Sequence, residues 1–301
     1  MPNRPITRRS MAGIMMAAGL MPLLSSMAMA GNYSKETPLK VALVVHGTLG
    51  DKSFFDSAAA GMKQAEVDLP VKADIIEAGL DRGRWQPTLA DAADRDFEVI
   101  IVGTWEMKDF LQDLSKQYTE KKFVIFDDSP DFSDGAYPNI QAITYGTASA
   151  AYLAGYASAK LSKTGKLGAI LGMEIPPVLD FVVGFEQGAK AANSDVTVTR
   201  AVVGSFGDPA KGKEIALAQF SEGVDIIFPI AGGTGIGALQ AARDQGKLAV
   251  GVDSDQAVAF AATDEAQAKV IFTSVEKKIG QSLITILRQT IDGTAAYGSN
   301  V

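Results

Sequence analysis

From Leu39 onward, the chain alternates short, continuously apolar runs with amphipathic stretches. Short apolar runs predict buried strands, and apolar residues that recur with helical periodicity predict helices. The expected strands are Leu39–Val45, Val71–Glu77, Val99–Val102, Phe123–Phe126, Ile140–Tyr145, Leu167–Leu171, Val196–Val203, Ile226–Pro229 and Ala249–Val252. The expected helices are Ser53–Val67, Trp85–Ala93, Met107–Tyr118, Ala148–Leu161, Phe181–Ala191, Lys211–Phe220 and Ile236–Gln245.

This alternation predicts parallel sheets that are covered by helices on both faces, because strands buried on both sides read as unbroken apolar runs. About a dozen strands are more than one open sheet comfortably holds. The 301 residues of the chain leave room for two sheets. The sequence therefore predicts an α/β fold with two doubly wound parallel-sheet lobes.

The first thirty residues carry a different pattern. A basic start is followed by an apolar run over residues 11–24 and by small residues at 28–30. This order is typical of a secretory signal peptide, and the run is short for a membrane span. We expect residues 1–30 to be removed and the protein to be periplasmic, with a membrane anchor as the alternative. The pair Arg8 and Arg9 leaves twin-arginine export open beside the general route.

Composition removes several classes of chemistry. The chain has no cysteine and a single histidine, His46, which excludes disulfide frameworks, cysteine nucleophiles and multi-histidine metal centres. A net charge of -7 argues against a nucleic-acid partner, because such proteins neutralise phosphates with basic residues. We expect no metal, no cofactor and no catalytic site.

The candidate site consists of the residues that follow the predicted strands, since ligands of open parallel sheets bind beyond the carboxyl ends of the strands. Aromatic rings, carboxylates and glycines gather there: His46, Asp51, Phe54, Phe55, Asp127, Phe206, Gly232, Gly233 and Asp253. Rings stack on aromatic faces, and carboxylates accept hydrogen bonds from hydroxyl groups. The set suits a neutral, ring-bearing ligand with several hydroxyls.

Several candidates also have a structural explanation. Phe54 could fasten the start of the first helix, and Asp127 could cap a turn. Phe181 lies at helical spacing from Phe185, which favours a core position. The segment 232–235 lacks the Lys-Ser/Thr of a phosphate-binding loop, so it is either a tight turn or a ligand contact. Lys277 lies at an expected helix start and could turn inward.

Four segments resemble the basic membrane protein family, the solute-binding proteins of ABC importers whose best-understood members are purine nucleoside receptors. They are Asp51–Phe54, Gly204–Lys213, Ala231–Gly235 and Gly251–Gln256. The resemblance runs from about Val41 to Asp292. It implies a type I periplasmic-binding fold with three crossing segments, an N-terminal lobe of residues 39–146 plus 273–301 and a C-terminal lobe of residues 147–272.

The resemblance also implies roles for particular residues. A purine ring would lie between Phe54 and Phe206, and ribose hydroxyls would meet Asp127, Asp253 and Lys277. The backbone at Gly232 and Gly233 would approach the sugar, with His46, Asp51, Phe55 and Phe181 also lining the site. The partners would be the small-molecule ligand and an ABC permease in the inner membrane, with the binding protein as a monomer.

Two positions depart from the family pattern, which usually has aspartate at His46 and asparagine at Phe55. We expect a purine nucleoside or nucleobase as the ligand, and a flavin-like or oxidised-purine ligand as the alternative. A nucleoside hydrolase and a ligand-sensing regulator are the alternatives from other classes. A nucleoside hydrolase would use Asp127 and Asp253 as acid and base, and a sensing regulator would carry a helix-turn-helix.

The expected mechanism is closure of two lobes around the ligand. The expected hinges lie near Tyr145-Gly146, Asp253–Asp255 and Ile271–Thr273. Members of the family usually continue beyond the position of Val301, where the further chain would complete the lobe reached through Lys277.

Overall fold

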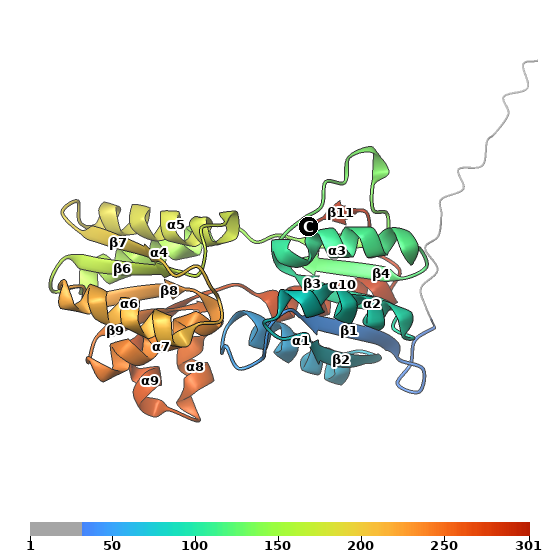
Figure 1. Ribbon diagram of the computed structural model, residues 1–301, viewed down its shortest axis with the longest axis horizontal. Helices are drawn as coiled ribbons and strands as arrows, with labels where there is room; N and C mark the ends of the chain where they lie inside the picture. The colour runs from blue at the N-terminus through green and yellow to red at the C-terminus, as the bar shows by residue number, and fades with distance from the viewer. Residues whose placement is uncertain (1–31) are drawn as a thin grey trace, which may run out of the picture.

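Two parallel β-sheets, each covered on both faces by helices, form two lobes that lie side by side (Figure 1). The structure is a computed structural model that describes residues 32–301, so the expected signal peptide at residues 1–30 lies outside the described residues. The predicted fold class is confirmed. Within the described residues, no helix is long and apolar enough to cross a membrane.

The first sheet has six parallel strands in the order β11-β5-β4-β3-β1-β2. They are β1 (Leu39–Val45), β2 (Val71–Glu77), β3 (Val99–Gly103), β4 (Lys122–Phe126), β5 (Ile140–Ile143) and β11 (Ser299–Asn300). One face packs on α1 (Phe54–Asp68) and α10 (Ile279–Ile291). The other face packs on α2 (Trp85–Asp94) and α3 (Thr104–Gln117).

The second sheet has five parallel strands in the order β10-β9-β8-β6-β7. They are β6 (Lys166–Leu171), β7 (Thr197–Val202), β8 (Ile226–Ile230), β9 (Leu248–Asp253) and β10 (Ile271–Glu276). One face packs on α4 (Ala148–Leu161) and α5 (Pro176–Ala192). The other packs on α6 (Pro209–Ser221) and α7 (Gly232–Asp244), with α8 (Gln256–Ala261) and α9 (Glu265–Val270) beside them.

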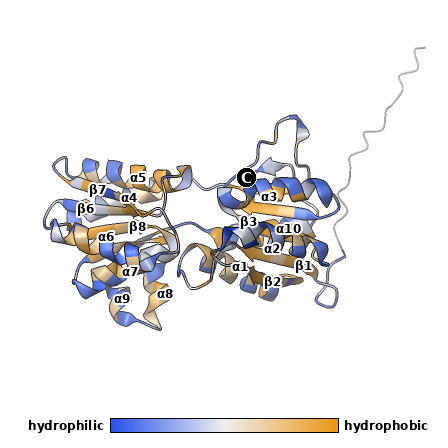
Figure 2. Ribbon diagram, viewed as in Figure 1, coloured by the Kyte–Doolittle hydropathy of each residue, from blue (hydrophilic) through white to orange (hydrophobic). Residues whose placement is uncertain are grey.

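Both sheets repeat one strand order, since β2-β1-β3-β4-β5 in the first corresponds to β7-β6-β8-β9-β10 in the second. Figure 2 shows hydrophobic residues along strands such as β1 and β4, and hydrophilic residues on the outer turns of the covering helices. In each sheet the chain first moves to one side, from β1 to β2 or from β6 to β7, and then continues on the other side of its first strand, at β3 or β8. This leaves a crevice at the carboxyl ends of β1 and β3 and at those of β6 and β8, where ligands of such sheets bind.

The described chain passes between the sheets twice, at residues 144–147 and at Lys277-Lys278. The expected hinge at Tyr145-Gly146 lies in the first of these crossings. The other two expected hinges are wrong as crossings, because Ile271–Thr273 lies inside β10, and Asp253–Asp255 leads into α8 of the same lobe.

No third crossing occurs between residues 32 and 301. Because β10 pairs with β9, residues 273–276 lie in the second sheet, whereas the expected boundary assigned them to the N-terminal lobe.

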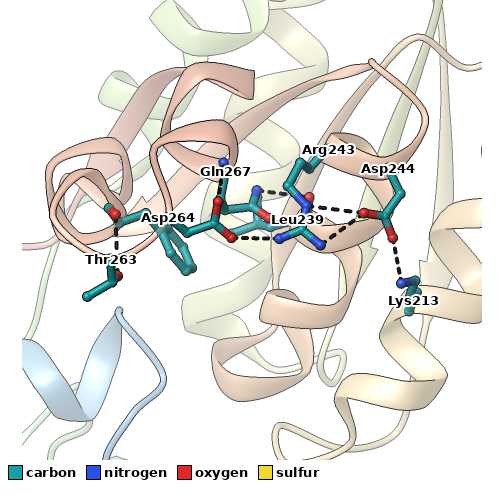
Figure 3. Close-up of polar contacts among 8 residues, drawn as sticks. Lys213, Leu239, Arg243, Asp244, Thr263, Asp264 and Gln267 are labelled. Atoms are coloured by element: carbon teal, nitrogen blue, oxygen red, sulfur yellow. Dashed lines mark hydrogen bonds and ion pairs between the residues drawn. The ribbon is translucent and has the colours of Figure 1, made fainter.

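Short polar contacts fasten α9 to the rest of the second lobe (Figure 3). Gln267 donates to a backbone carbonyl of α7 at 2.9 Å, and Arg243 reaches Asp264 at 2.6 Å. Arg243 also contacts Asp244, which pairs with Lys213 of α6 at 2.6 Å. These contacts tie α6, α7 and α9 together, and the chain stays in the second lobe from β9 to β10.

Candidate functional site: a cleft between the lobes

A cavity of about 840 Å³ lies between the carboxyl ends of the two sheets. All eleven residues expected from the sequence line it: His46, Asp51, Phe54, Phe55, Asp127, Phe181, Phe206, Gly232, Gly233, Asp253 and Lys277. Nine of them follow predicted strands, so the carboxyl-end rule located a cavity shared by both lobes, although it assigned no role to any single residue; the rule did not give Phe181 or Lys277.

The turn before α1 is built around the buried carboxylate of Asp51. Its two oxygens accept from the backbone N–H groups of Ser53 at 3.0 Å, Phe55 at 2.8 Å and Asp56 at 3.0 Å. Burial raises the pKa of Asp51 to about 6, while the three N–H donors act in the opposite direction. Since the backbone occupies both oxygens, Asp51 starts the helix and places the aromatic residues of its first turn.

Aromatic rings from both lobes form the middle of the cavity. Phe54 opens α1 and contacts the rings of Phe55 and Phe126, with centroids 5.3 and 5.2 Å apart. Phe206 enters from the loop before α6 and lies against Gly172, where an added Cβ would come within 2.3 Å of its ring. Glycine at 172 is therefore what lets this ring lie against the second lobe.

The loop that carries Phe206 is fixed from two sides. Asp208 caps α6 by accepting from the N–H of Lys211 at 3.0 Å. Thr234 donates its backbone N–H to the carbonyl of Phe206 at 2.9 Å, and its hydroxyl accepts from the N–H of Asp208 at 2.8 Å. This bracing holds the Phe206 ring at the cavity wall.

Two of the alternatives left open by the sequence now have a structural description. Phe181 is buried in the core of the second lobe, with its ring 6.0 Å from that of Phe228, and it also forms part of the cavity wall. Gly232 is the first residue of α7 and has a positive φ of 51°. The first turn of α7, including Gly233, faces the cavity with N–H groups that have no partner inside the helix.

A buried group of charged side chains closes one end of the cavity. The ammonium of Lys277 donates to both oxygens of Asp127, at 2.8 and 2.9 Å, and lies 3.9 Å from Asp253. The hydroxyl of Ser53, from the other lobe, donates to Asp253 at 2.8 Å. These four residues connect the two lobes at the floor of the cleft.

Burial dominates the titration of the two carboxylates in this group. It raises the pKa of Asp127 to about 6, although the Lys277 ammonium lowers it. Burial likewise raises the pKa of Asp253, against the effects of Lys277 and Ser53. Both aspartates have left-handed backbone, with φ of 67° and 64°. Such strained positions occur where a side chain must be aimed at a site.

Lys277 lies where the two crossing segments meet. It is the last residue before the chain returns to the first lobe, and its ammonium lies 5.6 Å from the ring of Tyr145 in the other crossing. The rings of Phe54 and Phe181 lie 5.5 and 5.0 Å away. Both crossings and both lobes are thus linked through one buried ammonium.

The cavity wall also holds residues that the sequence did not point to. Glu106 and Trp85 line it beside His46. The imidazole of His46 lies edge-on to the rings of Phe55 and Trp85, and its Nε2 is 3.0 Å from the hydroxyl of Thr104. Glu106 lies just beyond the end of β3, so the carboxyl-end rule could have found it. Trp85 gave no such signal, because it begins a helix.

The lobes also touch at the rim of the cleft. Leu80 of the first lobe lies against Gly207 of the second, where an added Cβ would meet the leucine side chain at 2.9 Å. The hydroxyl of Ser254 donates to the carbonyl of Lys52 at 2.8 Å. Among residues 32–301, no group of three or more His, Cys, Asp or Glu side chains could hold a metal ion.

A family model for Bmp, described as ABC transporter substrate-binding protein PnrA-like, matches residues 39–301. The chain belongs to the Bmp family. Basic membrane protein A1 of Borrelia garinii is 35% identical over 256 residues, which cover 84% of this chain and 72% of that protein. The nucleoside-binding protein BmpA of the ABC transporter of Lactococcus lactis is 29% identical, over 88% of this chain and 79% of that protein.

Solved structures show the same fold. A solute-binding protein of an ABC transporter from Aeropyrum pernix matches with a TM-score of 0.77 at 24% identity, covering 88% of this chain and 74% of that one. A myo-inositol binding protein from Caulobacter matches with a TM-score of 0.64 at 18% identity, covering 87% and 90%. The expected family and the type I periplasmic-binding fold are confirmed. Bmp-family proteins are solute-binding components of ABC transporters, a class that is extracellular or periplasmic.

Proposed function

We propose that this Bmp-family protein captures a purine nucleoside or nucleobase in the periplasm and delivers it to an ABC permease in the inner membrane. The observation that carries the proposal is the layout of the cavity: aromatic side chains in the middle and a buried polar group at one end. A nucleoside has the same layout, a flat ring joined to a hydroxyl-rich sugar. The relative in Lactococcus lactis that is named as nucleoside-binding supports this choice.

The flat ring would lie between Phe54 and Phe206. These two side chains come from different lobes, and both are only partly buried. Stacking contributes on the order of 1 kcal/mol for each aromatic face beyond the burial of apolar area. A ring held this way binds both lobes at once and so favours their closure.

The sugar would lie at the end formed by Asp127, Asp253 and Lys277. Carboxylates accept hydrogen bonds from hydroxyls, and an ammonium donates to hydroxyl oxygens. These groups are buried, so hydrogen bonds to them are stronger than they would be in water. The first turn of α7, at Gly232 and Gly233, would offer N–H donors to the same end.

Closure would occur about the two crossings at residues 144–147 and at Lys277-Lys278. On this view the N-terminal lobe comprises residues 39–146 and the segment after Lys277, and the C-terminal lobe comprises residues 147–276. Crossing segments of this kind absorb the backbone rotations of a hinge motion. The permease would bind the closed form.

We further propose that the site binds its ligand and does not cleave it. A hydrolase would need one carboxyl to protonate the leaving group and another to activate water. Here Lys277 contacts both oxygens of Asp127, and Ser53 contacts Asp253. These contacts support a role in holding hydroxyl groups.

The proposal is tested by a thermal-shift screen of the purified protein against purine and pyrimidine nucleosides, free bases, riboflavin, ribose and myo-inositol. A ligand at about one hundred times its Kd stabilises the folded state by about 2.7 kcal/mol. We expect a purine nucleoside or base to give the largest rise in Tm and to be recovered intact by mass spectrometry. A rise with riboflavin or a sugar alone, or recovery of a cleaved nucleoside, would contradict the proposal.

A further inference from the structure

The carboxylate of Glu106 lines the cleft and accepts no hydrogen bond from another side chain or from the backbone within residues 32–301. It lines the cavity beside His46, and its side chain is 14% exposed. Its nearest basic side chains are His46 at 3.4 Å and Arg82 at 3.8 Å. Neither contact is a hydrogen bond, and no other group within residues 32–301 donates to this carboxylate.

The side chains around Glu106 do not form hydrogen bonds with its carboxylate that would give it a structural role. The Nε2 of His46 lies closer to the hydroxyl of Thr104, at 3.0 Å, than to the glutamate. Arg82 is 57% exposed, lies over the rings of Trp85 and Phe110, and is not part of the cavity wall. A largely buried carboxylate that accepts no hydrogen bond is costly, so a donor on a bound ligand would be strongly favoured.

Glu106 is connected to the aromatic residues of the cavity through His46. Ring contacts run from Phe54 to Phe55 at 5.3 Å and from Phe55 to His46 at 5.0 Å, and His46 is the neighbour of Glu106. The side chain lies in the first turn of α3, where the helix dipole favours a negative charge. A ring stacked on Phe54 with its sugar toward Lys277 would direct its far edge toward Glu106.

We propose that Glu106 determines which ring the cleft accepts, by taking hydrogen bonds from two adjacent N–H donors on the ring edge. This rests on the proposed function. A carboxylate only accepts hydrogen bonds, and its two oxygens match paired donors. A 2-amino-6-oxopurine, as in guanosine, presents a ring N–H beside an amino group. Adenosine presents an amino group beside a ring nitrogen whose lone pair would face the carboxylate.

The selected class is therefore 2-amino-6-oxopurine nucleosides and bases, with 6-aminopurines disfavoured. Selectivity arises from attraction to one ring and repulsion of the other. A buried polar reader discriminates strongly, because the wrong ligand leaves it unpaired. Inosine has the ring N–H without the amino group and is expected to lie between the two.

The test is isothermal titration calorimetry of the wild-type protein, Glu106→Gln and Glu265→Gln with guanosine, inosine and adenosine. Glu265 is an exposed glutamate on α9 that does not line the cavity, and it serves as the matched control. The wild type is expected to bind guanosine at least about tenfold more tightly than adenosine, with inosine between them. Glu106→Gln is expected to lose at least about tenfold for guanosine and little for adenosine, whereas Glu265→Gln matches the wild type.

The wild-type series needs no substitution, so the proposal remains testable if Glu106→Gln does not fold. Equal or tighter binding of adenosine by the wild type, or an unchanged guanosine preference in Glu106→Gln, would overturn the role of Glu106 and leave the proposed function standing. Failure of the wild type to bind any nucleoside or base would overturn both.

Discussion

Replacing Lys277 by methionine tests the buried charged group at the floor of the cleft. Methionine keeps most of the apolar stem and removes the ammonium. Asp127 would then lose the donor to both of its oxygens, while Asp253 would keep Ser53. At neutral pH the variant must therefore either bury an unpaired carboxylate or take up a proton.

The expected loss of stability in Lys277→Met follows from the distance between Lys277 and Asp127. At a donor–acceptor distance of 2.8 Å, two unit charges in a medium of effective dielectric constant about 20 attract by about 6 kcal/mol. The ammonium also pays a desolvation cost, which the substitution removes. Breaking a buried pair by deleting one partner typically costs about 3–5 kcal/mol. That is a large part of the roughly 5–15 kcal/mol that stabilises an ordinary folded protein.

Urea unfolding followed by circular dichroism at pH 7 and pH 5 measures this cost. At pH 7, Lys277→Met is expected to be less stable than the wild type by about 3–5 kcal/mol. At pH 5 the loss is expected to shrink, because the pKa of Asp127 is already raised to about 6 and removal of a cation raises it further. Lys278→Met, at the adjacent lysine whose side chain is 70% exposed, is the control and is expected to change little.

Equal stability of the Lys277→Met and Lys278→Met variants at pH 7 would refute the reasoning. A loss for Lys277→Met that grows on acidification would refute it as well.

Four further results are expected. Phe206→Ala should weaken nucleoside binding roughly 10- to 50-fold in calorimetry, with little change in Tm. The control Phe132→Ala, at a residue that does not line the cavity, should leave Kd unchanged. Equal Kd values for both variants would count against stacking. Asp253→Asn should weaken nucleosides far more than free bases, and equal losses would remove its contact with the sugar. Gly172→Ala should act like Phe206→Ala, because its Cβ would come within 2.3 Å of the ring, and wild-type affinity would contradict that contact. The pKa of Asp127 is raised to about 6 in the folded protein, so the folded state binds this proton more tightly than the unfolded chain does. The stability that this proton contributes is fully present below about pH 4. About 2–3 kcal/mol of the free energy of unfolding is then lost as the pH rises through about 6. Asp127→Asn should remove that component in urea titrations across this range, and an unchanged pH profile would contradict the assignment.

Helices and strands were predictable from the sequence where burial gives a clear pattern of apolar residues. Leu39–Val45 is a continuously apolar run, and the structure gives β1 those same bounds. Prediction failed for β10, whose residues Ile271–Glu276 are mixed in polarity and only partly buried. It also failed for α8 and α9, which have six residues each and are too short for helical periodicity to show.

Helix starts were less predictable than helix interiors. Helix α3 begins at Thr104, three residues before the predicted Met107, and no side chain caps it. Helix α7 begins at Gly232, although its glycine-rich start disfavours a helix by propensity. In both cases packing against the sheet decides where the helix begins, and local sequence gives little sign of it.

The site was predictable in place but not in detail. Parallel strands bring their carboxyl ends to one edge, so the residues that follow them line one cavity. The contact between Ser53 and Asp253 joins residues 200 positions apart and depends on how the lobes meet. The capping role of Asp51 and the unsatisfied carboxylate of Glu106 likewise depend on surrounding groups that no local pattern reveals.

The central claim is that a flat ring is held between one phenylalanine from each lobe. A crystal structure of the purified protein with guanosine tests it most directly. The account predicts the base between Phe54 and Phe206, with the ribose hydroxyls at Asp127, Asp253 and Lys277. A base located elsewhere in the cleft, or a cleft in which guanosine contacts only one lobe, would contradict it.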